Sequence, residues 1–541
     1  MTGSMNDDKS GVERSAPTGC PSIFNDVIGP VMRGPSSSHC AAALRIGRMA
    51  RDLMGGNLEE ALIEFDLHGS LATTHQSQGS DMGLLAGFLG WEAADPRLPE
   101  SAQAAREAGI KVRIELKDLG DIHPNTYRLT LRNPAGQHSL VALSLGGGMI
   151  RVVEIDGFKV AMDGDCYETL FYLPSDGEAF VTALRGRIET EDIRLMDGPG
   201  GQLVEVKSPA ALKEKPIAEL CAQSGIKPAK VLAPVLPVLS HPGMRVPFIT
   251  CQEMLDYNRD KNLELWELAV RYESARGQLS PEDVFQRMAE IVHLLQASIR
   301  EGLKGTVFAD RILKVQSGLF QAGMQEQRLL DGGMLNRMIL YVTAMMEAKS
   351  SLGVIVAAPT AGSCGALPGA CLGAADALGL STDEITKAML AAGLVGIFIA
   401  AHATFAAEVG GCQAECGAGS GMAAAALVTL AKGTVRQATD AASMALQNIL
   451  GMICDPVAGR VEVPCLGKNV LAASNALACA NMALAGYDAV IPFDEVIEAM
   501  DRVGKSLPHE LRCTALGGLS ISKTSRAIED KLKKDLGPAF P

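Results

Sequence analysis

The sequence predicts an α+β protein, in which an N-terminal α/β domain with a small inserted module precedes a large, mainly α-helical domain. Alternating strand patterns and short helical stretches share residues 21–208, whereas helical patterns follow one another almost throughout from Phe248 onward. The chain has 541 residues, which is more than one hydrophobic core usually serves. Two or more domains are therefore expected.

The first predicted domain covers residues 21–148. A polar loop of serines and a histidine at 34–39 opens a helix whose Ala, Leu and Met residues continue to position 56. Alternating segments bounded by turn residues predict strands, and one more apolar stretch predicts a helix. The strands are expected at 62–70, 110–116, 126–133 and 138–148, and the helix at 80–91.

Residues 149–208 predict a separate small module, because their order of strand, strand, helix, strand, strand is typical of a ferredoxin-like fold. A linker with many prolines covers 209–252, and the helical domain covers 253–541. Residues 1–20 are polar, and we expect them to form a disordered tail.

Charge and composition exclude several classes of function. The net charge is −13 and the isoelectric point is about 5.3, so no nucleic-acid partner is expected, since phosphate binding relies on clustered Lys and Arg. The polar N-terminus has no apolar segment typical of a secretory signal, so the protein is expected to be cytoplasmic. The most apolar run, 389–401, is shorter than the about 20 residues of a membrane span, and no membrane segment is expected.

Three cysteines lie in loops punctuated by Gly or Pro, namely Cys412, Cys454 and Cys465. Such loops can bring sulfurs together from distant helices. Three thiolates without a fourth partner would leave one coordination position of a metal open, and an open Lewis acid can polarise a hydroxyl or carbonyl. From the residues alone, an iron–sulfur site, a zinc site and small buried side chains remain alternatives.

Two further loops have the composition of ligand-binding segments. The serines and histidine of 34–39 precede a helix whose N-terminal N–H groups suit a carboxylate, although one serine capping the helix gives the same pattern. Segment 359–369, PTAGSCGALPG, is too rich in Gly and Pro for a helix. It either brings its backbone close to a ligand or forms a tight connector.

Eight short motifs follow one another along 22–522. The first four are GPSSSH, HGSLATTHQSQGSD, HPNTYRL and SLGGGMI, and the last four are AAPTAGSCGALPG, GGCQAECG, CDPVAGRVEVPC and ALGGLS. In this order they resemble the motifs of the iron–sulfur L-serine dehydratases, in the form in which β and α portions are fused in one chain. The module at 149–208 resembles the ACT-like insertion of some members.

The resemblance implies a [4Fe-4S] cluster held by Cys412, Cys454 and Cys465, with one iron free. That iron would bind the hydroxyl of L-serine while a base removes the Cα proton, and the products would be pyruvate and ammonia. The substrate-binding residues that the resemblance implies are Ser36, Ser37, Ser38, His39, Thr360, Gly362, Lys468 and Asn469. We expect a homodimer that binds a small amino acid and that has neither nucleic acid nor membrane as a partner.

The sequence departs from the family pattern at the candidate general base. Gln78 stands where the family motif has a histidine, and an amide cannot take a proton. The candidates for that role are His75, His39 and His68.

Several cysteines also bear on the site. Cys513 stands where the family usually has an acidic residue, and Cys40 where it has a threonine. On a helix, Cys416 would share a face with Cys412 and could contact the cluster, but its role is left open, whereas Cys364 is a better candidate for a place beside the cluster than for a ligand. The departures leave two alternatives open. One is the same scaffold acting on another β-substituted amino acid or hydroxy acid, such as a cysteine desulfidase-like lyase. The other is a non-catalytic amino-acid and iron–sulfur sensor.

Overall fold

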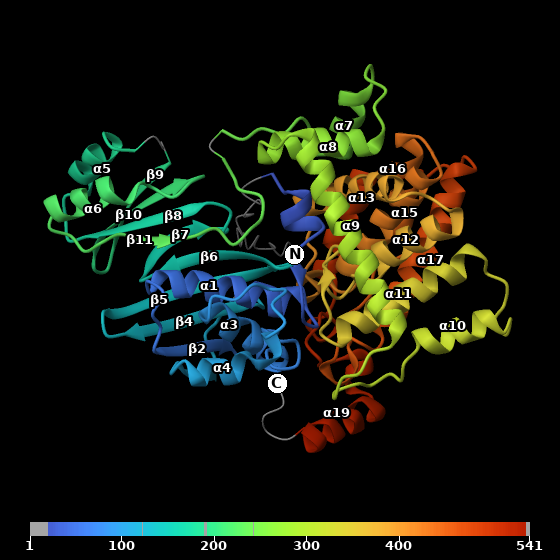
Figure 1. Ribbon diagram of the computed structural model, residues 1–541, viewed down its shortest axis with the longest axis horizontal. Helices are drawn as coiled ribbons and strands as arrows, with labels where there is room; N and C mark the ends of the chain where they lie inside the picture. The colour runs from blue at the N-terminus through green and yellow to red at the C-terminus, as the bar shows by residue number, and fades with distance from the viewer. Residues whose placement is uncertain (1–19, 122, 189–191, 242, 537–541) are drawn as a thin grey trace, which may run out of the picture.

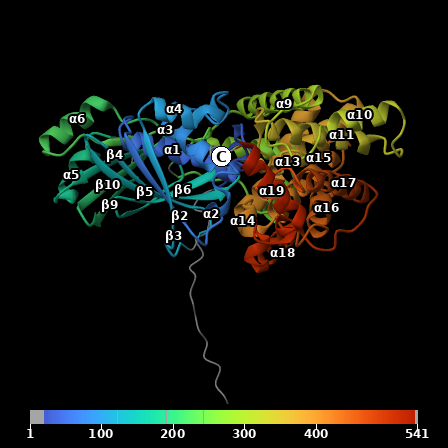
Figure 2. The same cartoon turned by 90° about the horizontal axis from the view of Figure 1, so that it is seen from below.

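The computed structural model describes residues 20–121, 123–188, 192–241 and 243–536, and it has the predicted α+β fold. A strand-rich lobe holds the N-terminal half of the chain, and a helical lobe holds the C-terminal half beside it (Figure 1). Figure 2 shows the same two lobes from below. Of the predicted tail at 1–20, only Cys20 is among the described residues.

The larger sheet of the strand-rich lobe has six strands in the order β3-β2-β4-β5-β6-β7. Strands β2 and β3 run parallel, and each other pair is antiparallel. One face packs against helix α1 in a buried apolar cluster that includes Ile46, Met49, Phe65 and Tyr127. The strands are β2 (Glu60–Asp66), β3 (Lys111–Lys117), β4 (Thr126–Asn133), β5 (Gly136–Gly146), β6 (Met149–Ile155) and β7 (Phe158–Met162). The helices are α1 (Ala42–Leu53), α2 (Leu71–Thr74), α3 (Ser80–Phe88) and α4 (Ser101–Glu107).

The smaller sheet has four antiparallel strands in the order β11-β8-β10-β9. With two helices between the strands, this is the ferredoxin-like arrangement. The helices cover one face of the sheet through apolar residues such as Phe171, Val204 and Leu220. In chain order the elements are β8 (Tyr167–Leu173), α5 (Gly177–Arg185), β9 (Ile193–Gly198), β10 (Gly201–Ser208), α6 (Glu214–Gln223) and β11 (Lys230–Leu232).

The limits of this module differ from the predicted 149–208. Strands β6 and β7 extend the larger sheet instead, because left-handed residues at the turns 147–148 and 156–157 fold each strand back onto the preceding one. At the other end, α6 and β11 lie in the segment predicted as linker and complete the module. A strand pattern predicts the order of strands, but it does not indicate which sheet each strand joins.

Residues 21–33 belong to the helical lobe, although the sequence placed them in the N-terminal domain. The turn η1 (Ile23–Val27) is buried against helix α13, in the core cluster of that lobe. Strand β1 (Val31–Met32) then pairs with β12 (Ile355–Val356) of the helical lobe. From its first described residues, the chain therefore runs in one lobe and crosses to the other just before the Ser-His loop at 34–39.

The helical lobe is built around α13 (Thr382–His402), which packs against α8, α9 and α15. With 21 residues this helix extends beyond the predicted apolar run, and it is long and apolar enough to span a membrane by composition. Its most apolar window is 78% buried, as in the core helix of a globular domain. The other helices are α7 (Cys251–Asn258), α8 (Leu265–Gly277), α9 (Pro281–Lys304), α10 (Ser317–Gln325), α11 (Met334–Ser350), α12 (Ala366–Leu378), α14 (Ala407–Gly410), α15 (Ala418–Leu430), α16 (Val435–Gln447), α17 (Cys465–Leu484), α18 (Phe493–Ser506) and α19 (Lys523–Leu536).

Helix α12 corrects one prediction, because it includes the second half of segment 359–369, which its Gly and Pro content predicted to be non-helical. Pro368 stands in the first turn, where no helical carbonyl requires its missing N–H, so the proline does not interrupt the helix.

Helices α1 and α3 cross closely because glycines face each other at the crossing. A Cβ on Gly87 would lie 2.3 Å from the carbonyl oxygen of Leu44, and one on Gly47 would lie 2.6 Å from that of Leu84. Helix α1 follows the Ser-His loop and α3 follows the turn that carries Gln78. The crossing therefore fixes these two segments relative to each other.

We expect the substitution Gly87→Ala to lower the free energy of unfolding by about 1 to 3 kcal/mol, because the added methyl forces the two helix backbones apart. Denaturant unfolding followed by circular dichroism measures it. Gly200→Ala is the matched control, since a Cβ there meets nothing within 4 Å. Equal stability of the two variants would contradict the close crossing.

Candidate active site

The two lobes meet just beyond the β1–β12 ladder of the helical lobe, and two loops leave this ladder together. The Ser-His loop follows β1 and leads through the turn η2 (Ser37–Ala41) into α1. Segment 359–365, called here the Thr-Gly loop, follows β12. The backbone N–H of Ala361 donates a hydrogen bond to Ser37 Oγ over 3.1 Å, so the loops lie against each other.

A buried chain of hydrogen bonds runs through the Ser-His loop into the helical lobe. His39 Nδ1 lies 3.1 Å from Ser36 Oγ, and its Nε2 lies 2.8 Å from Thr74 Oγ1. Ser38 Oγ donates to Glu408 Oε1 over 2.8 Å, and the same oxygen lies 3.4 Å from His39 Nδ1. The side chains of both lobes are thereby held in one polar network.

Burial dominates the electrostatics of this network. It lowers the pKa of His39, while the Glu408 carboxylate opposes that effect and His75 adds to it. His39 is therefore mainly neutral at neutral pH and able to accept a proton. Within the described part of the chain, the buried Oε2 of Glu408 has no hydrogen-bond partner, so this oxygen is available to a cationic group.

The three predicted ligand cysteines are all buried and come from three separate segments. Cys412 precedes the turn η4 (Gln413–Gly417), Cys454 forms a β-bridge with Arg512, and Cys465 is the first residue of α17. The structure brings the sulfurs of Cys412 and Cys454 within 4.8 Å of each other and of a Glu415 oxygen.

Further thiols adjoin this group. Hydrogen bonds with Cys412 and Cys513, together with burial, raise the pKa of Cys454. Burial and the neighbouring Cys412 raise the pKa of both Cys465 and Cys416. Cys416, Cys465 and Cys513 therefore lie within electrostatic reach of Cys412 or Cys454. We call these five thiols the thiol cluster.

Two lysines stand beside the thiol cluster, the buried Lys349 and the partly buried Lys468. Lys468 Nζ lies 3.9 Å from Cys412 Sγ and donates to Asp455 Oδ1 over 2.7 Å. Lys349 is 1% exposed, and its charge opposes the effect of burial on the pKa of Cys465. A positive charge near a thiol favours the thiolate, which is the form that binds metals.

The Thr-Gly loop faces Glu415. Thr360 Oγ1 donates to Glu415 Oε1 over 2.6 Å, and a Cβ on Gly362 would lie 2.9 Å from the same oxygen. Only a glycine therefore allows the carboxylate to approach so closely. Asn469 Nδ2 donates to the Gly362 carbonyl, and its Oδ1 accepts two N–H groups at the start of α12. Asn469 thus holds the shape of the loop.

The remaining predicted residues are placed differently from one another. His75 Nδ1 lies 2.7 Å from Asp81 Oδ1, and this pair is partly buried. His68 is exposed in the turn after β2. Gln78 is buried, and its Nε2 lies 3.5 Å from Cys513 Sγ. The structure therefore brings Gln78 to the thiol cluster, whereas His68 lies on the surface.

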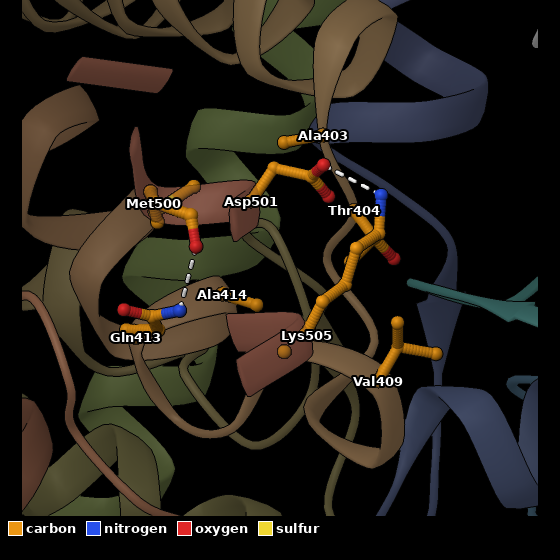
Figure 3. Close-up of a pocket in the computed structure, with 9 residues that line it drawn as sticks. Ala403, Thr404, Val409, Gln413, Ala414, Met500, Asp501 and Lys505 are labelled. Carbon is orange, nitrogen blue, oxygen red and sulfur yellow. Dashed lines mark hydrogen bonds and ion pairs between the residues drawn. The ribbon is translucent and has the colours of Figure 1, made fainter. Parts of the chain in front are cut away.

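A recess beside Cys412 is lined by α18 and by the segment before η4 (Figure 3). Gln413 Nε2 donates to the Met500 carbonyl over 2.8 Å, and Lys505 pairs with Asp501 over 2.6 Å. The cavity has a volume of about 10 Å³, which is enough for one water molecule. The residues that line the cavity support the loop that carries Cys412. The cavity itself is too small for an amino acid.

Sequence reasoning missed four titratable residues of this region, namely Glu408, Glu415, Lys349 and His123. Burial raises the pKa of Glu415 to about 7, Glu408 adds to the shift, and the hydrogen bond from Thr360 opposes it. Burial lowers the pKa of His123, and the charge of Glu408 opposes that effect. Both acids flank Cys412 in the segment EVGGCQAE, so their closeness to a candidate ligand was an available signal.

In this protein, thiols and carboxylates meet two loops that contain Ser and Thr at the boundary of the two lobes. This donor set is compatible with a metal cofactor. Family models match it in two parts, the serine dehydratase beta chain over residues 26–154 and the serine dehydratase alpha chain over residues 260–520. The chain belongs to the serine dehydratase family.

Individual relatives agree with this assignment. The chain is 36% identical over 285 residues to the probable L-serine dehydratase alpha chain of Bacillus subtilis (strain 168), covering 53% of this chain and 95% of the relative. It is 40% identical over 144 residues to the probable beta chain of the same organism, covering 27% and 64%. The L-serine dehydratase of Streptomyces coelicolor is 26% identical over 500 residues, covering 90% of this chain and 96% of the relative.

We expect the substitution Lys468→Met to lower the free energy of unfolding by about 3 kcal/mol, because it removes the cation paired with the buried Asp455 carboxylate. Urea unfolding of the full chain measures the change. Lys505→Met is the matched control, since Lys505 is 62% exposed and its pair with Asp501 contributes at most about 1 kcal/mol. Similar losses in the two variants would contradict the buried role of Lys468.

Proposed function

We propose that this protein is an L-serine ammonia-lyase that eliminates water from L-serine and releases pyruvate and ammonia with the help of a [4Fe-4S] cluster. The observation that carries the proposal is the contact of Ser38 and His39 with Glu408 across the lobe boundary, because Glu408 lies four residues before Cys412 of the thiol cluster. The names of the Bacillus subtilis and Streptomyces coelicolor relatives support the choice of L-serine.

The donor set fits an iron–sulfur cluster. Cys412, Cys454 and Cys465 would hold it, because their buried thiols come from three segments and two lysines favour their thiolate forms. When bound, such a cluster supplies a Lewis-acid iron that makes a hydroxyl a better leaving group. Burial raises the pKa of Cys364 and the charges of Lys349 and Glu415 also act on it, which supports a place beside the ligands.

The loops around the thiol cluster would orient the substrate. The free Oε2 of Glu408 suits the ammonium group of an amino acid, since a buried carboxylate oxygen without a partner is costly. The Ser36 hydroxyl would donate to the carboxylate, and the hydroxyls of Ser38 and Thr360 would do so by turning away from Glu408 and Glu415, to which they donate in the free protein. Ser37 and Asn469 would act on the backbone of the Thr-Gly loop and keep it in place.

Elimination requires that a base remove the Cα proton while the Cβ hydroxyl leaves as water. The enamine that remains tautomerises to an imine, and addition of water to the imine gives pyruvate and ammonia. His39 is the group we propose as the base, because it is buried, mainly neutral and part of the network that would hold the substrate. Glu415 is the second acceptor within reach of the thiols.

A different leaving group is the second candidate, and the pair formed by Gln78 and Cys513 favours it. The amide of Gln78 points at the thiol of Cys513, which itself hydrogen-bonds to Cys454. This extra thiol at the thiol cluster would suit a substrate whose β-substituent is sulfur. We also propose that the protein is cytoplasmic and acts as a homodimer.

The proposal predicts that the anaerobically purified, iron-reconstituted protein forms pyruvate from L-serine. A coupled lactate dehydrogenase assay measures the keto acid. L-cysteine is the competing substrate, and sulfide release from it without pyruvate from L-serine would favour the second candidate. Neither product from a protein with an intact cluster would contradict both.

The substitution Cys454→Ser is expected to abolish cluster binding, because it removes a ligand in the middle of the thiol cluster. Iron and acid-labile sulfide analysis after reconstitution measures the loss. The matched control is Cys479→Ser, since a serine hydroxyl can keep the hydrogen bonds of Cys479 with Asn448 and Asn475. Full iron content in the Cys454 variant would overturn the ligand assignment.

A further inference from the structure

A second and much larger cavity, of about 580 Å³, lies at the junction of the two lobes and the small module. Helix α1 forms one wall and α9 another, and Figure 1 shows these helices on facing sides of the lobe boundary. The segment 234–237, which leaves β11 of the small module, forms a third wall. None of the residues assigned above to the thiol cluster, the Ser-His loop or the Thr-Gly loop lines it.

Arg45 of α1 is the unusual residue of this cavity. It is only 5% exposed, and its guanidinium donates a hydrogen bond to the Gly148 carbonyl. Within the described ranges no carboxylate lies at ion-pair distance from it; Asp26 and Glu92 act on it only from farther away. A buried charge is costly unless it is paired, so this cation is prepared for an anion that enters the cavity.

The other charged groups of the cavity are satisfied by the protein or lie at its edge, and Glu290 is an exposed carboxylate of the latter kind. Arg48 pairs with Glu92 over 2.7 Å, and the latter carboxylate is 74% exposed. Arg287 donates to the Pro237 carbonyl over 3.3 Å. Among the described residues of the cavity, Arg45 is therefore the buried cation that has no carboxylate partner. Burial lowers the pKa of Arg45 to about 10, so its guanidinium remains protonated at neutral pH.

Much of the remaining lining is apolar. Phe24 and Ile28 come from the first described segment, Leu44 from α1, and Ile291 and Leu294 from α9. A volume of several hundred cubic ångströms with a largely apolar lining and a buried charge is typical of a site for a small organic ligand. An inorganic anion would lose its hydration water on entering the cavity. The apolar side chains offer it no replacement hydrogen bonds, so they disfavour such a ligand.

We propose that this cavity binds an amphiphilic carboxylate, whose carboxylate pairs with Arg45 and whose hydrocarbon part packs between α1 and α9. The ligand would contact both lobes and the segment that leads out of the small module. The site is independent of the proposed function, because it needs neither the thiol cluster nor a bound cofactor.

Hexanoate is a suitable probe, and hexanamide is its uncharged counterpart. Isothermal titration of the full chain should give saturable binding of hexanoate with one site per chain. Hexanamide should bind at least about tenfold more weakly, because it cannot form the charge-assisted hydrogen bond. Equal affinity for the two probes, or no saturable binding of hexanoate, would overturn the proposal.

Two variants locate the site. Arg45→Gln removes the cation and should weaken hexanoate binding about tenfold or more while leaving hexanamide binding unchanged. Leu294→Trp keeps Arg45 but fills the cavity from α9, so it should abolish binding of both probes even if the Arg45 variant does not fold. Arg51→Gln, on the same helix but outside the cavity, is the control and should bind as the parent does. Wild-type affinity in the Leu294 variant would place hexanoate elsewhere.

Discussion

The contact of Ser38 and His39 with Glu408 is the interaction on which the rest of the site depends. It joins the strand-rich lobe to the helical lobe inside the protein, where an unpaired carboxylate or imidazole would be costly. The β1–β12 ladder brings the two loops together, and the crossing of α1 with α3 fixes the Ser-His loop beside the turn of Gln78. Each of these packing features therefore acts on one network of buried polar groups.

The thiol cluster imposes a second constraint. Burial raises the pKa of its thiols, so the protein can present thiolates there only if positive charge compensates for the lost water. Lys468 and Lys349 supply part of that charge, and a metal cofactor would supply the rest. The same argument explains the acids around Cys412, since Glu408 is buried and Glu415 is partly buried beside cations and hydroxyl donors.

Much of the fold followed from periodicity, and the structure departs from it where packing decides. The strands and the helix predicted between 62 and 148 are present, because alternation and turn residues are local signals. The sheet to which β6 and β7 belong depends on hairpin turns and long-range pairing, which the pattern does not encode.

Among the candidate site residues, short motifs named Cys412, Cys454 and the Ser-His loop. Glu408, Glu415 and Lys349 escaped notice because only the tertiary fold buries them beside the thiols. His68 was chosen by residue type alone, and it lies on the surface.

The most direct test of the account asks whether substrate, thiol cluster and Ser-His loop share one site. Protein reconstituted anaerobically with ⁵⁷Fe would be examined by Mössbauer spectroscopy before and after addition of L-serine, alongside a Ser38→Ala variant. The account predicts that L-serine changes the signal of a single iron position in the parent, and that the variant needs a higher L-serine concentration for the same change. A spectrum that stays unchanged while the parent protein forms pyruvate would contradict it.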